Sequence, residues 1–120
     1  MDELTTTGTS HLALVDEGKV ETRTVDPAAM GLAKATLADL AGGTPEENAV
    51  TTRAILAGAE GPKRDIVLLN AAAALFVVGR TASLEEGLEV AAASIDGGAA
   101  VAKLEALAEA TTRAGKGATS

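Results

Sequence analysis

The stretch "DIVLLNAAAALFVVG", residues 65–79, decides the fold of this chain. Its apolar residues do not alternate with polar ones as in a half-buried strand, and the alanines at 71–74 favour a helix that ends at Gly79. A helix that is apolar on every side must be buried on every side. We therefore predict a central helix over residues 66–78, capped by Asp65. It needs more surrounding structure than the rest of this chain supplies.

One polar side chain, Asn70, interrupts this apolar run. A buried amide must find hydrogen-bond partners, so its ordinary role is a hydrogen bond inside the core. Contact with a ligand is the alternative. The sequence leaves the role of Asn70 open between these two.

The segments before the central helix carry local start and stop signals. In "GGTPEENAVTTRAILAG", residues 42–58, Thr44 is placed as the N-cap of a helix, Pro45 as its first residue and Glu47 as the capping-box partner. Gly58 ends this helix. The two glutamates at its positive end would repel a phosphate, so we do not expect the Gly-Gly turn to hold one.

Further upstream, residues 11–25 read as a β-hairpin at an edge, with "DEG" as a three-residue loop and Gly18 in its left-handed position. A turn or short helix is expected from Asp26-Pro27 to Gly31, and a second short helix over residues 37–41.

The segment after the central helix, residues 83–110, is predicted to be helical. Ser83 and Glu86 form a capping box, and Gly97-Gly98 breaks the pattern into two helices or kinks it. Residues 111–120 are small and polar, and we predict a flexible tail there.

Composition bounds the classes of function. The 120 residues suffice for one small domain, and the 47% hydrophobic content contains one aromatic residue, so the core is built of small side chains. A net charge of −7 argues against nucleic acid, and the absence of cysteine excludes disulfides and thiolate metal sites. No signal peptide or membrane span is recognised, which predicts a cytoplasmic protein without a membrane partner.

The chemistry-bearing residues gather at the start, in "MDELTTTG". From the residues alone, Asp2 and Glu3 are either a solvated end or half of a metal site. The threonines at 5–7 read as a strand, with phosphate contact as the alternative. His11 is expected to be exposed and idle, and Lys63-Arg64 to be surface charges in a linker.

Four segments, taken in order, resemble a known family: "DELTTTG", "GGTPEENA", "RAILAGAEGPKRDIVLLNAAAAL" and "SLEEGLEVAAASIDGGAAVAKLEAL". Their order and spacing are similar to the C-terminal portion of anthranilate phosphoribosyltransferase, from Asp2 to about Leu107. The family usually has Leu before the acidic pair, where this chain has Met1, and often Ser-Gly at Gly97-Gly98.

The resemblance implies an α/β fold of the nucleoside phosphorylase/phosphoribosyltransferase type. This chain would be a partial, mostly helical C-terminal piece of it with an N-terminal β-hairpin, residues 1–110 belonging to the α/β domain. It implies a glycosyltransferase (pentosyltransferase) of tryptophan biosynthesis, which transfers the phosphoribosyl group of phosphoribosyl pyrophosphate to anthranilate. Asp2 and Glu3 match the family's acidic pair, which holds Mg²⁺ near the pyrophosphate.

The family's phosphate loop, "Gly-Thr-Gly-Gly-Asp", and its "His-Gly-Asn" segment lie upstream of the matched portion. The resemblance therefore implies that this chain acts with the upstream half of the enzyme, in a homodimer when complete, and is inactive alone; we predict no catalytic residue in it. A truncation, a misplaced start and half of a split enzyme are equally compatible with the sequence. A non-catalytic α-rich docking module is the alternative function.

Overall fold

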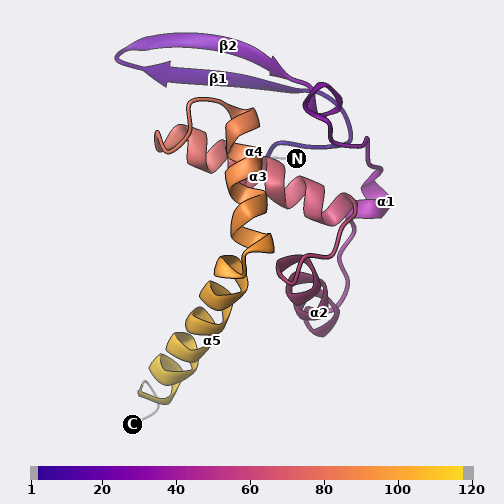
Figure 1. Cartoon of the computed structure of the whole chain (residues 1–120), viewed down its shortest axis with the longest axis vertical. Coiled ribbons are helices and arrows are strands. Elements are labelled where there is room, and N and C mark those ends of the chain that lie inside the picture. Colours follow the sequence, from indigo (N-terminus) through magenta and orange to yellow (C-terminus); the bar gives the residue numbers. More distant parts are fainter. Residues whose placement is uncertain (1–2, 118–120) are drawn as a thin grey trace.

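The computed structural model describes residues 3–117, which form a two-stranded sheet, a short 3-10 helix and five α-helices (Figure 1). The elements in chain order are β1 (Ser10–Asp16), β2 (Lys19–Val25), η1 (Pro27–Met30), α1 (Leu37–Leu40), α2 (Pro45–Leu56), α3 (Pro62–Val77), α4 (Leu84–Asp96) and α5 (Ala99–Gly117). No helix within these residues is both long and apolar enough to cross a membrane.

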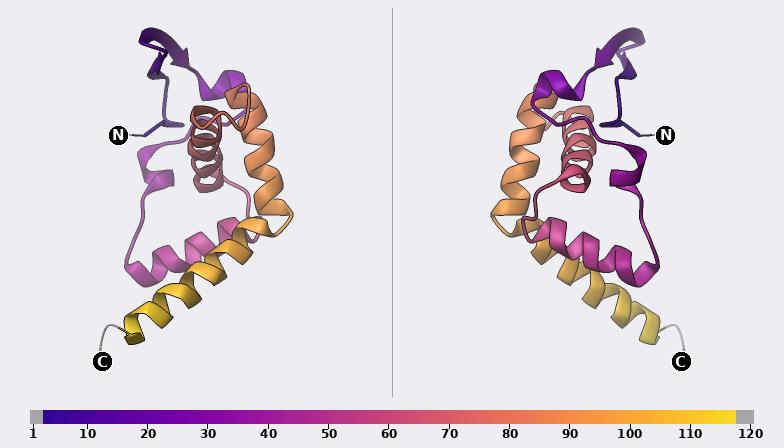
Figure 2. Two further views of the ribbon diagram at one scale, coloured as in Figure 1. Left: turned by 90° about the vertical axis from the view of Figure 1, so that its left-hand side faces the viewer. Right: turned by 90° about the vertical axis from the view of Figure 1, so that its right-hand side faces the viewer.

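Helix α3 lies at the centre of the molecule. It packs chiefly against α4, while the hairpin lies at the opposite end of the molecule from α5 (Figure 1). Helix α2 contacts both α4 and α5, and α5 extends away from the remaining elements (Figures 1 and 2). The predicted order of a hairpin followed by helices is confirmed.

The central helix is buried on only part of its surface within the described residues; the sequence predicted that burial on every side needs more surrounding structure than this chain supplies. Leu68, Leu69 and Ala72 are buried, but Val77 and Val78 are 71% and 70% exposed. The hairpin, the N-terminal segment and α4 cover only part of the helix surface. The large apolar side chains left exposed are those of Val67 and Val77 on α3 and of Val78 directly after it.

The start of α3 also differs from the prediction. The helix begins at Pro62, with Gly61 as its N-cap, so Asp65 lies in the first turn and does not cap it. Proline suits the first helical position because its fixed φ is already helical and its missing N–H would have no helical partner there. Gly79, with φ of 75°, follows the last turn as predicted.

The hairpin loop is shorter than predicted. Asp16 pairs with Lys19, so only Glu17 and Gly18 form the loop, with φ of 47° and 77°. Two residues with positive φ give a turn whose twist matches that of the strands, which is why a two-residue loop replaces the expected three-residue one.

The helix caps follow the sequence closely. Thr44 and Glu47 form the predicted capping box of α2, with each side chain bonded to the other's backbone N–H. At α4 only half is confirmed: Ser83 accepts from the Glu86 N–H, but the Glu86 carboxylate accepts from the Ala82 N–H instead.

The C-terminal helices divide where the glycines predicted a break. Helix α4 ends at Asp96 and α5 begins at Ala99, with Gly98 at φ of 86° between them. Helix α5 continues to Gly117, so residues 111–117 are helical where the sequence suggested an irregular tail. The domain boundary at residue 110 and the flexibility of the tail stay predictions.

Two apolar clusters hold the elements together. Leu68 of α3 packs with Ala91 and Ile95 of α4. On the other side of α3, Leu69 packs with Leu4 and Val25. Adjacent residues of one helix thus bind α4 on one side and the N-terminal segment on the other.

Candidate functional site

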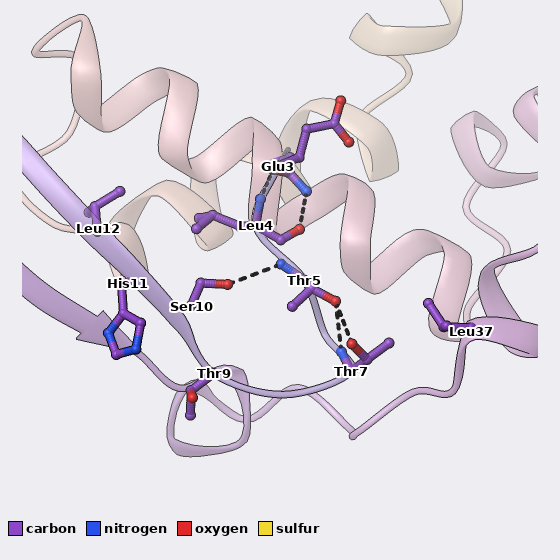
Figure 3. A pocket seen from close by; sticks show the side chains of 10 residues that line it. Glu3, Leu4, Thr5, Thr7, Thr9, Ser10, His11, Leu12 and Leu37 are labelled. Atoms are coloured by element: carbon purple, nitrogen blue, oxygen red, sulfur yellow. Dashed lines mark hydrogen bonds between the residues drawn. The ribbon is translucent and has the colours of Figure 1, made fainter. Parts of the chain in front are cut away.

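The residues before β1 form an irregular segment that lies along a pocket. Glu3, Leu4, Thr5, Thr7 and Asn70 are among the residues that line it (Figure 3). The wall therefore combines the N-terminal segment with one side chain of α3. It is mostly polar, with a carboxylate, hydroxyls and an amide.

The threonine run is not a strand, contrary to the prediction. The Thr7 N–H donates to Thr5 Oγ1 at 3.0 Å, and the two hydroxyls are 2.8 Å apart (Figure 3). A threonine hydroxyl that bonds the backbone two residues later holds a turn, and this local bond competes with strand pairing. Both hydroxyls line the pocket as a consequence.

Thr6, between them, points inward. Its side chain is 2% exposed, and its Oγ1 has no hydrogen-bond partner within residues 3–117. Its carbonyl oxygen accepts from the Ala35 N–H at 3.0 Å, which ties the segment to the chain after η1. The run therefore alternates two pocket-facing hydroxyls with one inward side chain.

The predicted metal pair is described in part. Asp2 lies outside the described residues. Glu3 is exposed, and its carboxylate points away from the hydroxyls of Thr5 and Thr7 (Figure 3). Residues 3–117 contain no cluster of three or more Asp, Glu or His that could hold a metal ion.

The donor chemistry nevertheless fits Mg²⁺. Glu3 offers an exposed carboxylate at the pocket wall, and the hydroxyls of Thr5 and Thr7 add further hard oxygen atoms to that wall. Mg²⁺ keeps several waters and is commonly held by one or two carboxylates together with substrate phosphate oxygens. A closed cage of protein ligands is therefore not required of this site.

Asn70 connects the pocket to the core. Its Oδ1 accepts from the Leu4 N–H at 3.0 Å, and its Nδ2 donates to the Leu4 carbonyl at 2.9 Å and to the Ile66 carbonyl at 3.0 Å. Leu4 is the residue next to Glu3. Of the two roles left open for Asn70, the structure shows the hydrogen bond within the protein, to a partner 66 residues away that sequence reasoning missed.

The structure agrees with the prediction for His11 but not with that for Lys63 and Arg64. His11 is exposed, as predicted, and lines the pocket. Arg64 is not a surface charge: its side chain is 10% exposed and makes two bonds of 2.9 Å to Asp96. Hydrogen bonding to Asp96 raises the pKa of Arg64. Lys63 and Arg64 belong to the first turns of α3, not to a linker.

Comparison with known proteins shows the family to which this chain belongs. Residues 1–101 match the model of the "Glycosyl transferase family, a/b domain". The chain belongs to this family. The predicted family and fold class are confirmed, the chain being a mostly helical piece of the fold with an N-terminal hairpin.

The similar proteins share one name. The chain is 50% identical over 107 residues to the anthranilate phosphoribosyltransferase of Moorella thermoacetica, covering 89% of this chain and 32% of that protein. It spans about a third of the length of the curated relatives that it matches.

Solved structures agree with this likeness. The crystal structure of the Thermus thermophilus anthranilate phosphoribosyltransferase superposes with a TM-score of 0.75 and 39% identity, over 88% of this chain and 31% of that one. A variant of the Saccharomyces cerevisiae enzyme with Mg bound has a TM-score of 0.76 and 28% identity, over the same shares of the two chains.

Proposed function

We propose that this chain is part of an anthranilate phosphoribosyltransferase. In that role it supplies the acidic segment of the active site to an enzyme that transfers phosphoribosyl from phosphoribosyl pyrophosphate to anthranilate. The observation that carries the proposal is 50% identity over 107 residues to a protein of that name. A TM-score of 0.75 to a solved enzyme of the same name supports it.

Glu3, together with Asp2, would hold Mg²⁺ in this role. A bound Mg²⁺ supplies a positive charge that stabilises the departing pyrophosphate. Glu3 lies at the wall of the pocket that Thr5 and Thr7 also line, so its exposed carboxylate is within the same segment as these hydroxyls. The similar structure of the Saccharomyces cerevisiae enzyme variant, which has Mg bound, supports the choice of metal.

The rest of the enzyme would cover the apolar surfaces that this chain exposes. The hairpin carries Val15 and Val20, 73% and 67% exposed. Val77 ends α3 and Val78 follows it, and these are 71% and 70% exposed. A second pocket, lined by Val15, Phe76 and Val77, lies where hairpin and helix meet. Exposed apolar side chains that lie together, as Val15 and Val77 do at this pocket, favour burial against further protein. We propose the upstream half of the enzyme as this partner and a homodimer as the complete assembly.

The experiment follows anthranilate fluorescence with phosphoribosyl pyrophosphate and Mg²⁺. It compares this chain alone, the upstream two-thirds of the Moorella thermoacetica enzyme alone, and the two together, or joined as one chimeric chain. We expect turnover only when both parts are present. Turnover by this chain alone would contradict its dependence on the upstream part.

Turnover in neither the mixture nor the chimera would contradict the proposed function and favour the non-catalytic docking module. Glu3→Gln with Asp2→Asn should abolish the chimera's activity, because the neutral amides bind Mg²⁺ poorly. Glu89→Gln removes another exposed carboxylate, on α4, and should leave turnover unchanged.

A further inference from the structure

Asn70 and Leu4 form a paired contact that resembles one rung of a sheet. The amide of Asn70 accepts from the Leu4 N–H at 3.0 Å and donates to the Leu4 carbonyl at 2.9 Å. A side chain of α3 thereby satisfies both backbone groups of a residue that is 9% exposed. Such groups are costly to leave unpaired, so the contact fixes Leu4 to the helix.

The amide has no donor left for a ligand. A primary amide carries two N–H donors, and those of Nδ2 point to the carbonyls of Leu4 and Ile66, at 2.9 and 3.0 Å. The bond to Ile66, one turn earlier on α3, fixes the orientation of the amide plane. Ligand contact, the alternative that the sequence left open, is therefore the weaker reading even though Asn70 lines the pocket.

The segment that Asn70 holds has few other ties to the core. It precedes β1, so the hairpin ladder does not include it. Within the described residues, a backbone hydrogen bond from the Ala35 N–H to the Thr6 carbonyl ties it to a distant segment. The Leu4 side chain packs on Leu69, the residue beside Asn70. Neighbouring residues of α3 thus anchor the backbone and the side chain of Leu4.

We propose that Asn70 is a positioning residue for Glu3, which the proposed function makes a metal ligand. It holds Leu4 in place and thereby holds the backbone of the adjoining Glu3 at the wall of the pocket. This inference rests on the proposed function. Asn70 acts through the backbone and does not touch the metal. Groups that hydrogen-bond directly to a metal ligand are commonly worth ~10-fold to 100-fold in metal affinity, and we expect this contact, one residue removed, to lie at the lower end of that range.

Two variants separate this role from a merely structural one. Asn70→Leu has a similar volume but neither donates nor accepts, so it releases Leu4. Leu68→Ala, two residues earlier on α3, weakens the cluster with Ala91 and Ile95 and leaves the contact between Asn70 and Leu4 intact. Should Asn70→Leu fail to fold, Asn70→Ser keeps the position polar but is too short to bridge both groups of Leu4.

The first readout is amide hydrogen exchange of the 120-residue chain, followed by NMR. We expect Asn70→Leu to accelerate exchange of the Leu4 N–H by more than ~10-fold relative to other amides, because its acceptor is gone. In Leu68→Ala the Leu4 N–H should show no such selective change. An unchanged Leu4 amide in Asn70→Leu would overturn the anchoring step.

The second readout is the metal requirement of the chimera with the upstream part of the Moorella thermoacetica enzyme. Asn70→Leu should raise the Mg²⁺ concentration for half-maximal activity by ~10-fold or more, and weaken Mn²⁺ binding measured by EPR in parallel. At saturating Mg²⁺, kcat should recover most of the wild-type value. Leu68→Ala should lower the Tm and leave both the Mg²⁺ concentration for half-maximal activity and the affinity for Mn²⁺ unchanged.

The two failures are distinguishable. An active wild-type chimera whose Mg²⁺ and Mn²⁺ constants do not respond to Asn70→Leu would overturn the positioning role alone. A chimera that is inactive with Asn70 in place would overturn the proposed function, and the positioning role with it. Equal losses of metal affinity in Asn70→Leu and Leu68→Ala would also overturn the positioning role, because general destabilisation would then explain both losses.

Discussion

Gly87 of α4 lies directly against Ala72 of α3. A Cβ at position 87 would be 2.8 Å from both the Cα and the carbonyl oxygen of Ala72. Both residues are buried, so the absence of a side chain at one of them lets the two helices approach closely. This contact sets the separation of the two central helices.

Gly87→Ala should therefore destabilise the chain by about 1–3 kcal/mol, since the new methyl meets backbone that cannot rotate away. Alanine is the better helix former by only about 1 kcal/mol, which is too little to offset the clash. Gly115→Ala is the control, because position 115 in α5 has open space around it. Urea denaturation measures both, and equal stability of the two variants would contradict the close contact.

Leu69→Ala should cost about 2–5 kcal/mol of unfolding free energy, the usual range for a buried leucine. Leu69 is 0% exposed and packs on Leu4 and Val25, so the loss should also loosen the hairpin base. Val77→Ala, on the exposed face of the same helix, should change stability by less than about 0.5 kcal/mol in the isolated chain. Thermal unfolding followed by circular dichroism compares them. A similar loss of stability in both variants would contradict the difference in burial between the two faces of α3.

Arg64→Lys should destabilise the chain by about 1 kcal/mol, because an ammonium cannot reproduce the two-bond fork to Asp96. The effect stays below that of a fully buried ion pair because the Asp96 side chain is 57% exposed. Arg23→Lys is the control, since its partner Glu21 and Arg23 itself are both largely exposed. Chemical denaturation at low and high salt measures the difference. An equal effect of the two substitutions would count against the Arg64 contact.

Stability should depend on pH through Asp39. The N–H and the hydroxyl of Thr36 donate to its carboxylate at 2.7 and 2.8 Å, and these bonds lower the pKa of Asp39. A lowered folded-state pKa contributes stability that is present above the ordinary carboxyl value and is lost as the pH falls through the lowered value. NMR titration should give a midpoint below that of an unstructured aspartate.

The pKa of Asp65 changes in the opposite direction to that of Asp39. Burial raises its pKa, so its contribution to stability is present below the ordinary value and is lost as the pH rises through the raised one. Its NMR midpoint should lie above that of an unstructured aspartate. Midpoints in the reverse order for Asp39 and Asp65 would contradict both assignments.

Glu17→Asn should tighten the hairpin. Glu17 adopts a φ of 47°, which costs a residue with a long side chain about 1–2 kcal/mol, while Asn before Gly suits this turn. We expect slower hydrogen exchange of the hairpin amides by NMR. Asp16→Asn, one residue earlier and paired with Lys19, should change exchange little. Faster exchange in Glu17→Asn would rule out the turn type.

The sequence by itself determined the family and part of the local structure. The capping box of Thr44 and Glu47, the helix break at Gly97-Gly98 and the hairpin follow from residues close together in the chain, because caps and turns are short-range. The assignment of Asp2 and Glu3 as a metal-binding pair rests on the resemblance, which four motifs in order carry. It stays a prediction.

Only the tertiary structure decided which residues meet across the chain. Asn70 finds Leu4 at a separation of 66 residues, and Arg64 finds Asp96 at a separation of 32. The sequence shows that an amide or a guanidinium needs a partner. Which residue becomes that partner depends on how α3 packs against α4 and the N-terminal segment. Burial depends in the same way on neighbours, so an apolar pattern alone could not tell which faces of α3 these elements would leave exposed.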